Sequence, residues 1–299
     1  MEYKTLGKSN LKVSRVSFGC MSLGEDGVAN KTLLHQALNQ GINLFDTADL
    51  YGNGKNEETV GHAFKGMRNQ VIIATKVGNQ WRTDGSGWDW NPTKDYILQA
   101  VDKSLQRLQT DYIDLYQLHG GTLEDPIDET IEAFERLMDA GKIRYYGISS
   151  IRPNVIGEYV KRSRITSVMM QYSLLDRRPE ETALGLLKEN DIGVLVRGSL
   201  AQGLLAGKPA KEYLKYTTAE VSTAAQAVTN ITGTSRTAAS SVATQFVLNH
   251  AAVTSAVLGI RTPEQLSQAI EVNQSPALTA SEINGLSQTL PANTYEQHR

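Results

Sequence analysis

The sequence has a single cysteine, Cys20, and no long run of apolar residues. One thiol cannot form a disulfide within the chain, so internal cross-links do not stabilise the fold. No segment approaches the ~18 apolar residues of a membrane-spanning helix. The start at Met1 also lacks the basic and then apolar pattern of a secretory signal. These absences predict a soluble protein of the reducing cytoplasm, with no membrane partner.

The sequence also lacks a strong charge of either sign. Its 30 Lys and Arg residues nearly balance 32 Asp and Glu residues, and the formal net charge is −2. Nucleic-acid binding depends largely on positive charge, so we expect no nucleic-acid partner. The composition leaves open whether the chain is a monomer or a homo-oligomer.

Short apolar or β-branched runs alternate with longer segments of helical periodicity. Ile97, Val101, Leu105 and Leu108 share one helical face, for example. This alternation predicts parallel strands with right-handed crossovers, and eight such units close a (β/α)8, or TIM, barrel. An open doubly wound sheet is the alternative, although no Gly-x-Gly-x-x-Gly turn follows the first strand. The eight candidate strands are 16–19, 42–46, 71–76, 113–119, 143–149, 167–172, 193–197 and 255–259.

Turn and capping residues mark the other elements. Asn56 and Thr93 are each expected to cap a helix. Residues 3–19 contain two short alternating runs around GKSN, typical of a β-hairpin, which would close the bottom of the barrel. Residues 216–241, rich in Ala, Thr and Ser, are interpreted as an extra helix and a loop. We therefore expect one barrel domain over residues 1–299.

Polar residues end three neighbouring candidate strands. Asp46, Lys76 and His119 end the second, third and fourth strands, and Tyr51 lies in the loop after the second. The carboxyl ends of barrel strands share one rim, where active sites form, so these four side chains should converge. A buried Lys is rare unless paired, and Asp46 is the expected partner. The alternative is that each polar residue only ends its strand in water.

This set of side chains suits acid catalysis. An ammonium group beside Tyr51 would lower the pKa of its phenol, ordinarily ~10. Tyr51 would then be the general acid, Lys76 its tuning cation, Asp46 the anchor, and His119 a donor to an oxygen. The set needs no metal and no nucleophile, and it suits carbonyl reduction by an external hydride. A Schiff-base lyase that uses Lys76 remains an alternative.

Five motifs, in order along the chain, resemble the aldo-keto reductases. They are FDTADLYGNGKNEETVG at 45–61, ATK at 74–76, DYIDLYQLH at 111–119, GKIRYYGIS at 141–149 and GIRTPEQL at 259–266. The resemblance runs from Tyr3 to Leu290. Within the family, the chain resembles bacterial members that are related to potassium-channel β subunits. It implies a TIM barrel that reduces aldehydes or ketones with NADPH, and its catalytic tetrad falls on Asp46, Tyr51, Lys76 and His119. Because such relatives attach to channels, a nucleotide-sensing binding subunit with little turnover also stays open.

The resemblance further implies the residues that bind NADPH or NADP+. Arg197 replaces an aromatic residue that stacks on the nicotinamide in many members, and Ser150 replaces an Asn. Arg261 can pair with a 2′-phosphate, which favours NADPH over NADH, but Gln268 and Ala269 replace a usual Glu-Asn pair. The implied cofactor residues are Gly19, Met21, Asp46, Ser149, Ser150, Gln171, Arg197, Gly198, Ser199, Leu200, Gly203, Lys208, Gly259, Arg261 and Gln265.

All three tryptophans lie in one segment shortly after Lys76, GNQWRTDGSGWDWNP. We expect Trp81, Trp88 and Trp90 to form an apolar wall or lid over a small carbonyl substrate, which Tyr51 and His119 would also contact. Packing at the rim without substrate contact is the alternative. Cys20 is expected to be a small packed residue without a redox role.

Overall fold

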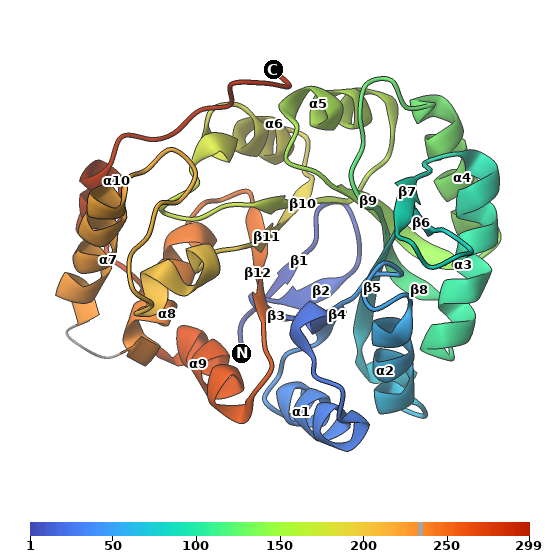
Figure 1. Ribbon diagram of the computed structural model, residues 1–299, viewed down its shortest axis with the longest axis horizontal. Coiled ribbons are helices and arrows are strands. Elements are labelled where there is room, and N and C mark those ends of the chain that lie inside the picture. The colour runs from blue at the N-terminus through green and yellow to red at the C-terminus, as the bar shows by residue number, and fades with distance from the viewer. Residues whose placement is uncertain (233–235) are drawn as a thin grey trace.

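Eight parallel strands form a closed barrel in this computed structural model, which describes residues 1–232 and 236–299 (Figure 1). The (β/α)8 prediction is confirmed and the open sheet is wrong. Every pair of neighbouring barrel strands runs parallel. Around the barrel the strands are β10 (Ser167–Gln171), β11 (Gly193–Arg197), β12 (Val253–Gly259), β3 (Val16–Gly19), β4 (Leu44–Asp46), β5 (Ile72–Val77), β8 (Ile113–Leu118) and β9 (Ile143–Ser149).

Helices surround the barrel (Figure 1), and α7 and α10 pack on each other outside the helices that cover the strands. In α3, the predicted face is confirmed because Ile97, Val101 and Leu108 are buried. The helices are α1 (Gly27–Asn39), α2 (Lys55–Phe64), α3 (Lys94–Leu108), α4 (Ile127–Asp139), α5 (Pro153–Arg162), α6 (Ala183–Glu189), α7 (Thr218–Thr232), α8 (Arg236–Leu248), α9 (Pro263–Gln274) and α10 (Ala280–Thr289). Short 3-10 helices are η1 (Cys20–Ser22), η2 (Arg68–Gln70), η3 (Arg178–Glu180) and η4 (Ala201–Ala206).

The candidate strands match the observed ones to within two residues at each end. The cap at Asn56 is wrong, because α2 begins at Lys55 after Gly54, whose positive φ of 84° forms the N-cap. In the segment 216–241, α7 accounts for the extra helix and α8 already begins at Arg236. The expected loop falls partly on 233–235, which lie outside the described residues.

An N-terminal hairpin closes the bottom of the barrel, as predicted. Its strands β1 (Tyr3–Thr5) and β2 (Lys12–Ser14) pair antiparallel. Its turn buries Leu6 and Leu11 in a small core inside the barrel. Gly7, at φ 51°, packs so tightly there that a Cβ atom would lie 2.2 Å from the Thr166 carbonyl oxygen. The other members of this inner core are Val13, Leu44, Ala74, Leu115, Met169, Leu195 and Val257.

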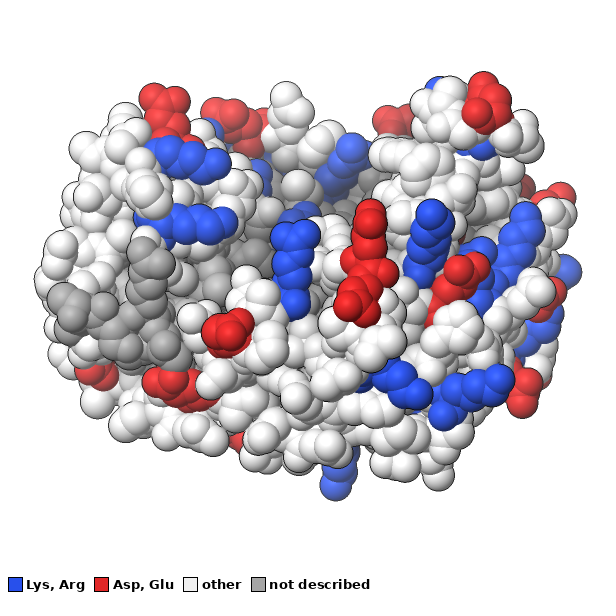
Figure 2. Space-filling model, turned by 60° about the horizontal axis from the view of Figure 1, so that its bottom comes forward, with Lys and Arg blue, Asp and Glu red and all other residues white. Residues whose placement is uncertain are grey.

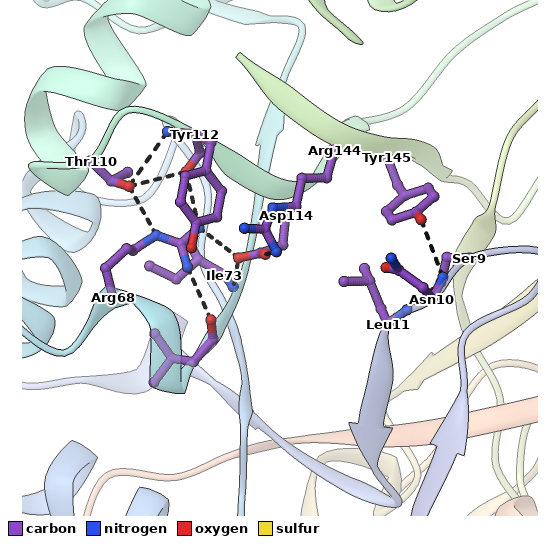
Figure 3. A network of polar contacts seen from close by, with 11 residues as sticks. Ser9, Asn10, Leu11, Arg68, Ile73, Thr110, Tyr112, Asp114, Arg144 and Tyr145 are labelled. Carbon is purple, nitrogen blue, oxygen red and sulfur yellow. Dashed lines mark hydrogen bonds and ion pairs between the residues drawn. The ribbon is translucent and has the colours of Figure 1, made fainter. Parts of the chain in front are cut away.

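A polar network ties the amino ends of β5, β8 and β9 together near the hairpin (Figure 3). The buried Asp114 carboxylate accepts from the Ile73 amide at 2.9 Å and pairs with Arg68 and Arg144 at 2.5 and 3.3 Å. Both guanidinium groups lie 4.0 Å from the centroid of the Tyr112 ring, on which they stack. With these ends held, the opposite ends of the strands form the functional rim.

The outer surface mixes charges of both signs. In Figure 2, Lys and Arg side chains are interspersed with Asp and Glu over the face in view. This pattern agrees with the near-zero net charge of −2. Within the described ranges, no helix is long and apolar enough to cross a lipid bilayer.

The tight packing of Gly7 gives a test of the hairpin closure. Gly7→Ala should lower the free energy of unfolding by about 3 kcal/mol or more, because it adds a clash with backbone to the cost of a positive φ. Gly66→Ala is the matched control, since Gly66 has φ 79° and open space around it; its cost should be about 1 kcal/mol. Urea unfolding measures both, and equal losses would show that the turn is not tightly packed.

Candidate active site

Lys76 is the buried centre of the rim. Its ammonium group donates to both oxygens of Asp46, at 2.8 and 2.7 Å, and to the Thr47 carbonyl oxygen at 2.8 Å. The Lys76 side chain is only 1% exposed. Strands β4 and β5 are neighbours in the barrel, which places the two charges side by side. The predicted pairing of Lys76 with Asp46 is confirmed.

Tyr51 and His119 complete the cluster. The Tyr51 hydroxyl lies 3.4 Å from Lys76 Nζ, and the Lys76 ammonium lies 5.1 Å from the Tyr51 ring centroid. The His119 ring meets the Tyr51 ring edge-on, with centroids 5.9 Å apart and an interplanar angle of 84°. All four predicted side chains therefore come together at the carboxyl ends of β4, β5 and β8.

Burial and ion pairing shift the pKa values of Lys76 and Asp46 in opposite directions. Burial lowers the pKa of Lys76, but Asp46 and Tyr51 outweigh this effect, so the net pKa lies above the ordinary value. Burial raises the pKa of Asp46, and Lys76 offsets part of the shift. Because both Asp46 oxygens accept from one ammonium group, Lys76 carries its charge.

The Tyr51 phenol and the His119 imidazole are both neutral near pH 7. Burial raises the pKa of Tyr51, and the nearby Lys76 lowers it only in part. The expectation of a net lowered phenol pKa is therefore wrong, because burial outweighs the ammonium group. Burial, with Lys76 and Arg197, lowers the pKa of His119 to about 3. The imidazole can thus donate one hydrogen bond without carrying charge.

Two side chains, Asn56 and Glu57, position the loop of Tyr51. Asn56 accepts from the Thr47 hydroxyl at 2.6 Å and donates to the Cys20 carbonyl oxygen at 2.8 Å. The fully buried Glu57 accepts from the Thr75 hydroxyl at 2.6 Å and pairs with Arg107 at 2.6 Å. Sequence reasoning missed both roles, although each residue lies within six positions of Tyr51.

Asp49 is a buried acid that sequence reasoning also missed. Its Oδ1 is buried without a hydrogen-bond partner in the described parts of the chain. Burial, together with nearby Glu57, raises the pKa of Asp49 to about 8, and Arg107 and Lys76 oppose this shift. Asp49 is therefore protonated at neutral pH.

The predicted cofactor residues occupy the other side of the rim. Except for Asp46, which ends β4, they lie at or after the ends of β9, β10, β11, β12 and β3, which are consecutive around the barrel, while the catalytic candidates come from β4, β5 and β8. Met21 follows β3 and is 65% exposed. Ser149 ends β9, and Ser150 is buried, with its hydroxyl accepting from the Arg152 amide. Cys20 is buried, as predicted.

Gln171 is held in one orientation by a polar network. Its amide nitrogen donates to Asp176 at 2.7 Å and to the Tyr213 hydroxyl at 3.2 Å. Its amide oxygen accepts from Arg197 at 2.9 Å. Asp176 is fully buried and is also paired with Arg178 at 2.7 Å. Neither Asp176 nor Tyr213 was predicted as part of this network; Tyr213 lies 42 positions along the chain from Gln171.

The segment after β11 contains small residues and backbone turns. Gly198 and Gly203 have φ angles of 76° and 92°, and a Cβ atom at Gly203 would lie 2.9 Å from the Lys208 side chain. Ser199 is buried, and its hydroxyl oxygen has no partner among the described residues. Leu200 packs against the core. This segment thus combines two glycines at positive φ with Lys208.

The residues after β12 lie at the amino end of α9. A Cβ atom at Gly259 would lie 2.9 Å from the Ser22 hydroxyl. The Gln265 side chain accepts from the Arg261 amide at 2.8 Å, while both side chains are exposed. Ala269 is buried in the core, so it cannot replace the contacts of a polar residue there.

The three tryptophans lie on an antiparallel ribbon, β6 (Asn79–Trp81) and β7 (Trp88–Trp90). Trp81 pairs with Trp88, and alternation along the strands puts Trp90 on the same face. Trp90 donates to Asp125 at 2.9 Å, which ties the ribbon to the loop after β8. Trp88 is 47% exposed. The shared face agrees with the wall that we expected; substrate contact stays a prediction.

A closed parallel barrel with a buried lysine, an aspartate and a tyrosine on its rim defines an enzyme class that handles small molecules at that rim. The aldo/keto reductase family model matches residues 15–290. The chain belongs to the aldo/keto reductase family and is an oxidoreductase of that family. The resemblance expected from the sequence is therefore confirmed.

Individual relatives agree with this assignment. An "Uncharacterized oxidoreductase YqkF" of Bacillus subtilis (strain 168) is 49% identical over 308 residues, with 100% of each chain covered. The structure of the aldo-keto reductase AKR11C1 from Bacillus halodurans, in its holo form, is 49% identical, with a TM-score of 0.95 and coverage of 100% and 99%.

Two further relatives carry different cofactor names. "Aldo-keto reductase yakc [NADP(+)]" of Schizosaccharomyces pombe is 34% identical over 69% of this chain and 64% of its own length. The "NADH-specific methylglyoxal reductase" of Escherichia coli (strain K12) is 34% identical over 70% of each chain.

The pKa of Asp49 predicts a pH-dependent stability. Asp49 takes up a proton on folding wherever the pH lies between its unfolded value of 3.8 and about 8. Its contribution to the free energy of unfolding is therefore fully present below that window. The contribution is lost as the pH rises through the window, by up to about 1.4 kcal/mol per pH unit. The difference between wild type and Asp49→Asn in urea unfolding from pH 5 to 8 should show this slope. Parallel curves would contradict a buried, protonated Asp49.

Proposed function

We propose that the protein reduces aldehydes or ketones to alcohols with NADPH, and that Tyr51 is the general acid. The observation that carries this proposal is the contact of the Tyr51 hydroxyl with Lys76 Nζ at 3.4 Å, with Lys76 held by Asp46. A reduced nicotinamide supplies a hydride when bound. The protein must then supply a proton and stabilise charge on the carbonyl oxygen.

Each residue of the cluster has a distinct role in this proposal. Tyr51 donates its hydroxyl proton to the oxygen that gains charge, and Lys76 stabilises the resulting phenolate. Asp46 holds Lys76 in place and keeps it charged. Neutral His119 donates a hydrogen bond to the same oxygen and so orients the carbonyl group. Because Tyr51 has a raised pKa, it retains its proton until a carbonyl oxygen is in place.

The residues of the cofactor side fit a dinucleotide. Gln171 and Ser149 would hold the nicotinamide amide, with Asp176 and Tyr213 fixing the Gln171 orientation. Gly198 and Gly203, both at positive φ, and the Lys208 side chain beside Gly203 suit a pyrophosphate after β11. We assign the remaining contacts to Gly19, Met21, Asp46, Ser150, Arg197, Gly198, Leu200, Gly203, Lys208, Gly259, Arg261 and Gln265.

NADPH is favoured over NADH by Arg261. Its exposed guanidinium lies beside the amino end of α9, where backbone amides attract anions. A 2′-phosphate can accept two hydrogen bonds from such a group. The cytoplasm, where both cofactors occur, is the proposed location.

The lyase alternative is disfavoured by Lys76 itself. Asp46 and Tyr51 raise the pKa of Lys76 beyond the effect of burial, and three oxygens already accept from its ammonium group. A charged amine is a poor nucleophile. A nucleotide-sensing subunit with little turnover would have no need for a buried Tyr51 beside this pair.

The substrate side is assigned to Tyr51, His119 and the tryptophan ribbon. Trp81, Trp88 and Trp90 share one face, which supports an apolar wall beside the reacting carbonyl. This arrangement favours small carbonyl compounds with a flat or apolar substituent.

Replacing the acid tests the catalytic assignment. Tyr51→Phe should lower kcat for a simple aldehyde about 10²–10⁴-fold, because the proton donor is lost, while the Kd for NADPH stays the same. Steady-state NADPH oxidation and calorimetric titration measure the two quantities. Full activity in this variant would exclude Tyr51 as the acid. Borohydride trapping of substrate on Lys76 would instead support the lyase.

Cofactor preference tests the role of Arg261. The Kd of the wild type should be smaller for NADPH than for NADH, and Arg261→Ala should weaken NADPH binding about tenfold or more. NADH binding should not change, because it lacks the 2′-phosphate. If Arg261→Ala alters neither Kd, the phosphate assignment is wrong.

A further inference from the structure

The segment that follows α10, residues 291–299, runs from that helix toward α5 and packs against the loop after β10 (Figure 1). The Asn293 side chain accepts from the Arg177 amide at 2.8 Å and donates to the Leu175 carbonyl oxygen at 3.4 Å. Asn293 and Tyr295 are both buried. The segment 291–299 thus holds the backbone of the loop after β10 on both sides of Asp176.

Asp176 connects this segment to Gln171. Its carboxylate accepts from the Gln171 amide nitrogen at 2.7 Å, and its two oxygens accept from Arg178 at 2.7 and 2.8 Å. The Arg178 guanidinium lies 5.2 Å from the centroid of the Tyr295 ring, within the range of a cation–π interaction. The contacts therefore run without a gap from the segment 291–299 to Gln171.

The second partner of the Gln171 amide nitrogen is tied to the same segment. The Tyr213 hydroxyl accepts from Gln171 at 3.2 Å, and the Tyr213 backbone pairs with that of Tyr216. The Tyr216 hydroxyl donates to the Pro291 carbonyl oxygen at 2.7 Å. The segment 291–299 therefore supports both groups that fix the orientation of Gln171.

These contacts determine which atom of Gln171 is left for a ligand. The amide nitrogen has two N–H groups, and Asp176 and Tyr213 accept from it. The amide oxygen has two lone pairs, and Arg197 uses one of them. The other lone pair can accept from the amide nitrogen of a nicotinamide. If the Gln171 amide turned over, an N–H group would face that nitrogen and the hydrogen bond would be lost.

We propose that Asn293 and Tyr295 are positioning residues for cofactor binding, which hold the loop after β10 so that Gln171 presents its oxygen to the nicotinamide amide. The inference rests on the proposed function, in which Gln171 binds that amide. A side chain that is already held in its binding orientation loses less conformational entropy when the ligand binds. The segment 291–299 therefore contributes to the affinity for the nicotinamide end of the cofactor without touching it.

Calorimetric titration of the full chain with NADPH and with 2′-phospho-ADP-ribose, which lacks the nicotinamide, tests the proposal. Tyr295→Leu and Asn293→Ala should each weaken NADPH binding about fivefold, and the Kd for 2′-phospho-ADP-ribose should stay the same. Tyr295→Phe keeps the ring beside Arg178 and should match the wild type in both constants. Gln297→Ala, at an exposed position of the same segment, is the control and should also match it.

A double-mutant cycle shows whether the effect passes through Gln171. Gln171→Ala should weaken NADPH binding at least as much as Tyr295→Leu does. Adding Tyr295→Leu to Gln171→Ala should then leave the Kd for NADPH where it is, because the group that Tyr295 positions is already gone. Additive losses would show that the segment acts on another part of the site, and would overturn the inference.

Other results would also overturn it. An unchanged Kd for NADPH in both Tyr295→Leu and Asn293→Ala would show that the segment does not hold Gln171. An equal weakening of NADPH and of 2′-phospho-ADP-ribose would show a general loss of structure. If the wild type binds neither molecule, the proposed function itself fails.

Discussion

The ion pair between Lys76 and Asp46 is the interaction on which the functional rim depends. Two charges are removed from water at the ends of neighbouring strands, and this is tolerated only because the Lys76 ammonium donates to three oxygens within 2.8 Å. The same ammonium lies against the Tyr51 phenol. Burial that would be costly for an isolated lysine thus creates a dry, positively charged surface for one hydroxyl group. The closed barrel, held at its other end by the hairpin and the Asp114 network, keeps these strands in register.

The fold and the central cluster were predictable from local patterns. Strand runs ending in Asp46, Lys76 and His119 became informative once barrel closure put their ends on one rim. The predictions that were wrong concern contacts between distant residues, or a balance between burial and charge. Asn56 was expected to cap a helix, but its amide instead joins Thr47 and Cys20. The net pKa of Tyr51 depends on burial, which no spacing of residues reveals. The roles of Asp49 and Asp176 depend on burial, which the spacing of residues along the chain does not show.

The proposed function divides the rim between two tasks. Strands β4, β5 and β8 carry the candidates for proton transfer, and the consecutive strands β9, β10, β11, β12 and β3 carry the candidates for cofactor binding. The charge of Arg197, at the end of β11, lowers the pKa of Tyr51 and the pKa of His119. A residue of the cofactor side therefore influences the protonation of the catalytic side. Family membership accounts for the shared framework.

The fate of the transferred hydrogen tests the central claim most directly. With cofactor carrying two deuterium atoms at nicotinamide C4, mass spectrometry and NMR of the alcohol product should find one deuterium on the carbinol carbon and none exchanged with solvent. This result is predicted if the Tyr51, Lys76 and Asp46 cluster lies beside a bound nicotinamide. An alcohol without deuterium, or no alcohol at all over many turnovers with simple aldehydes, would contradict the account.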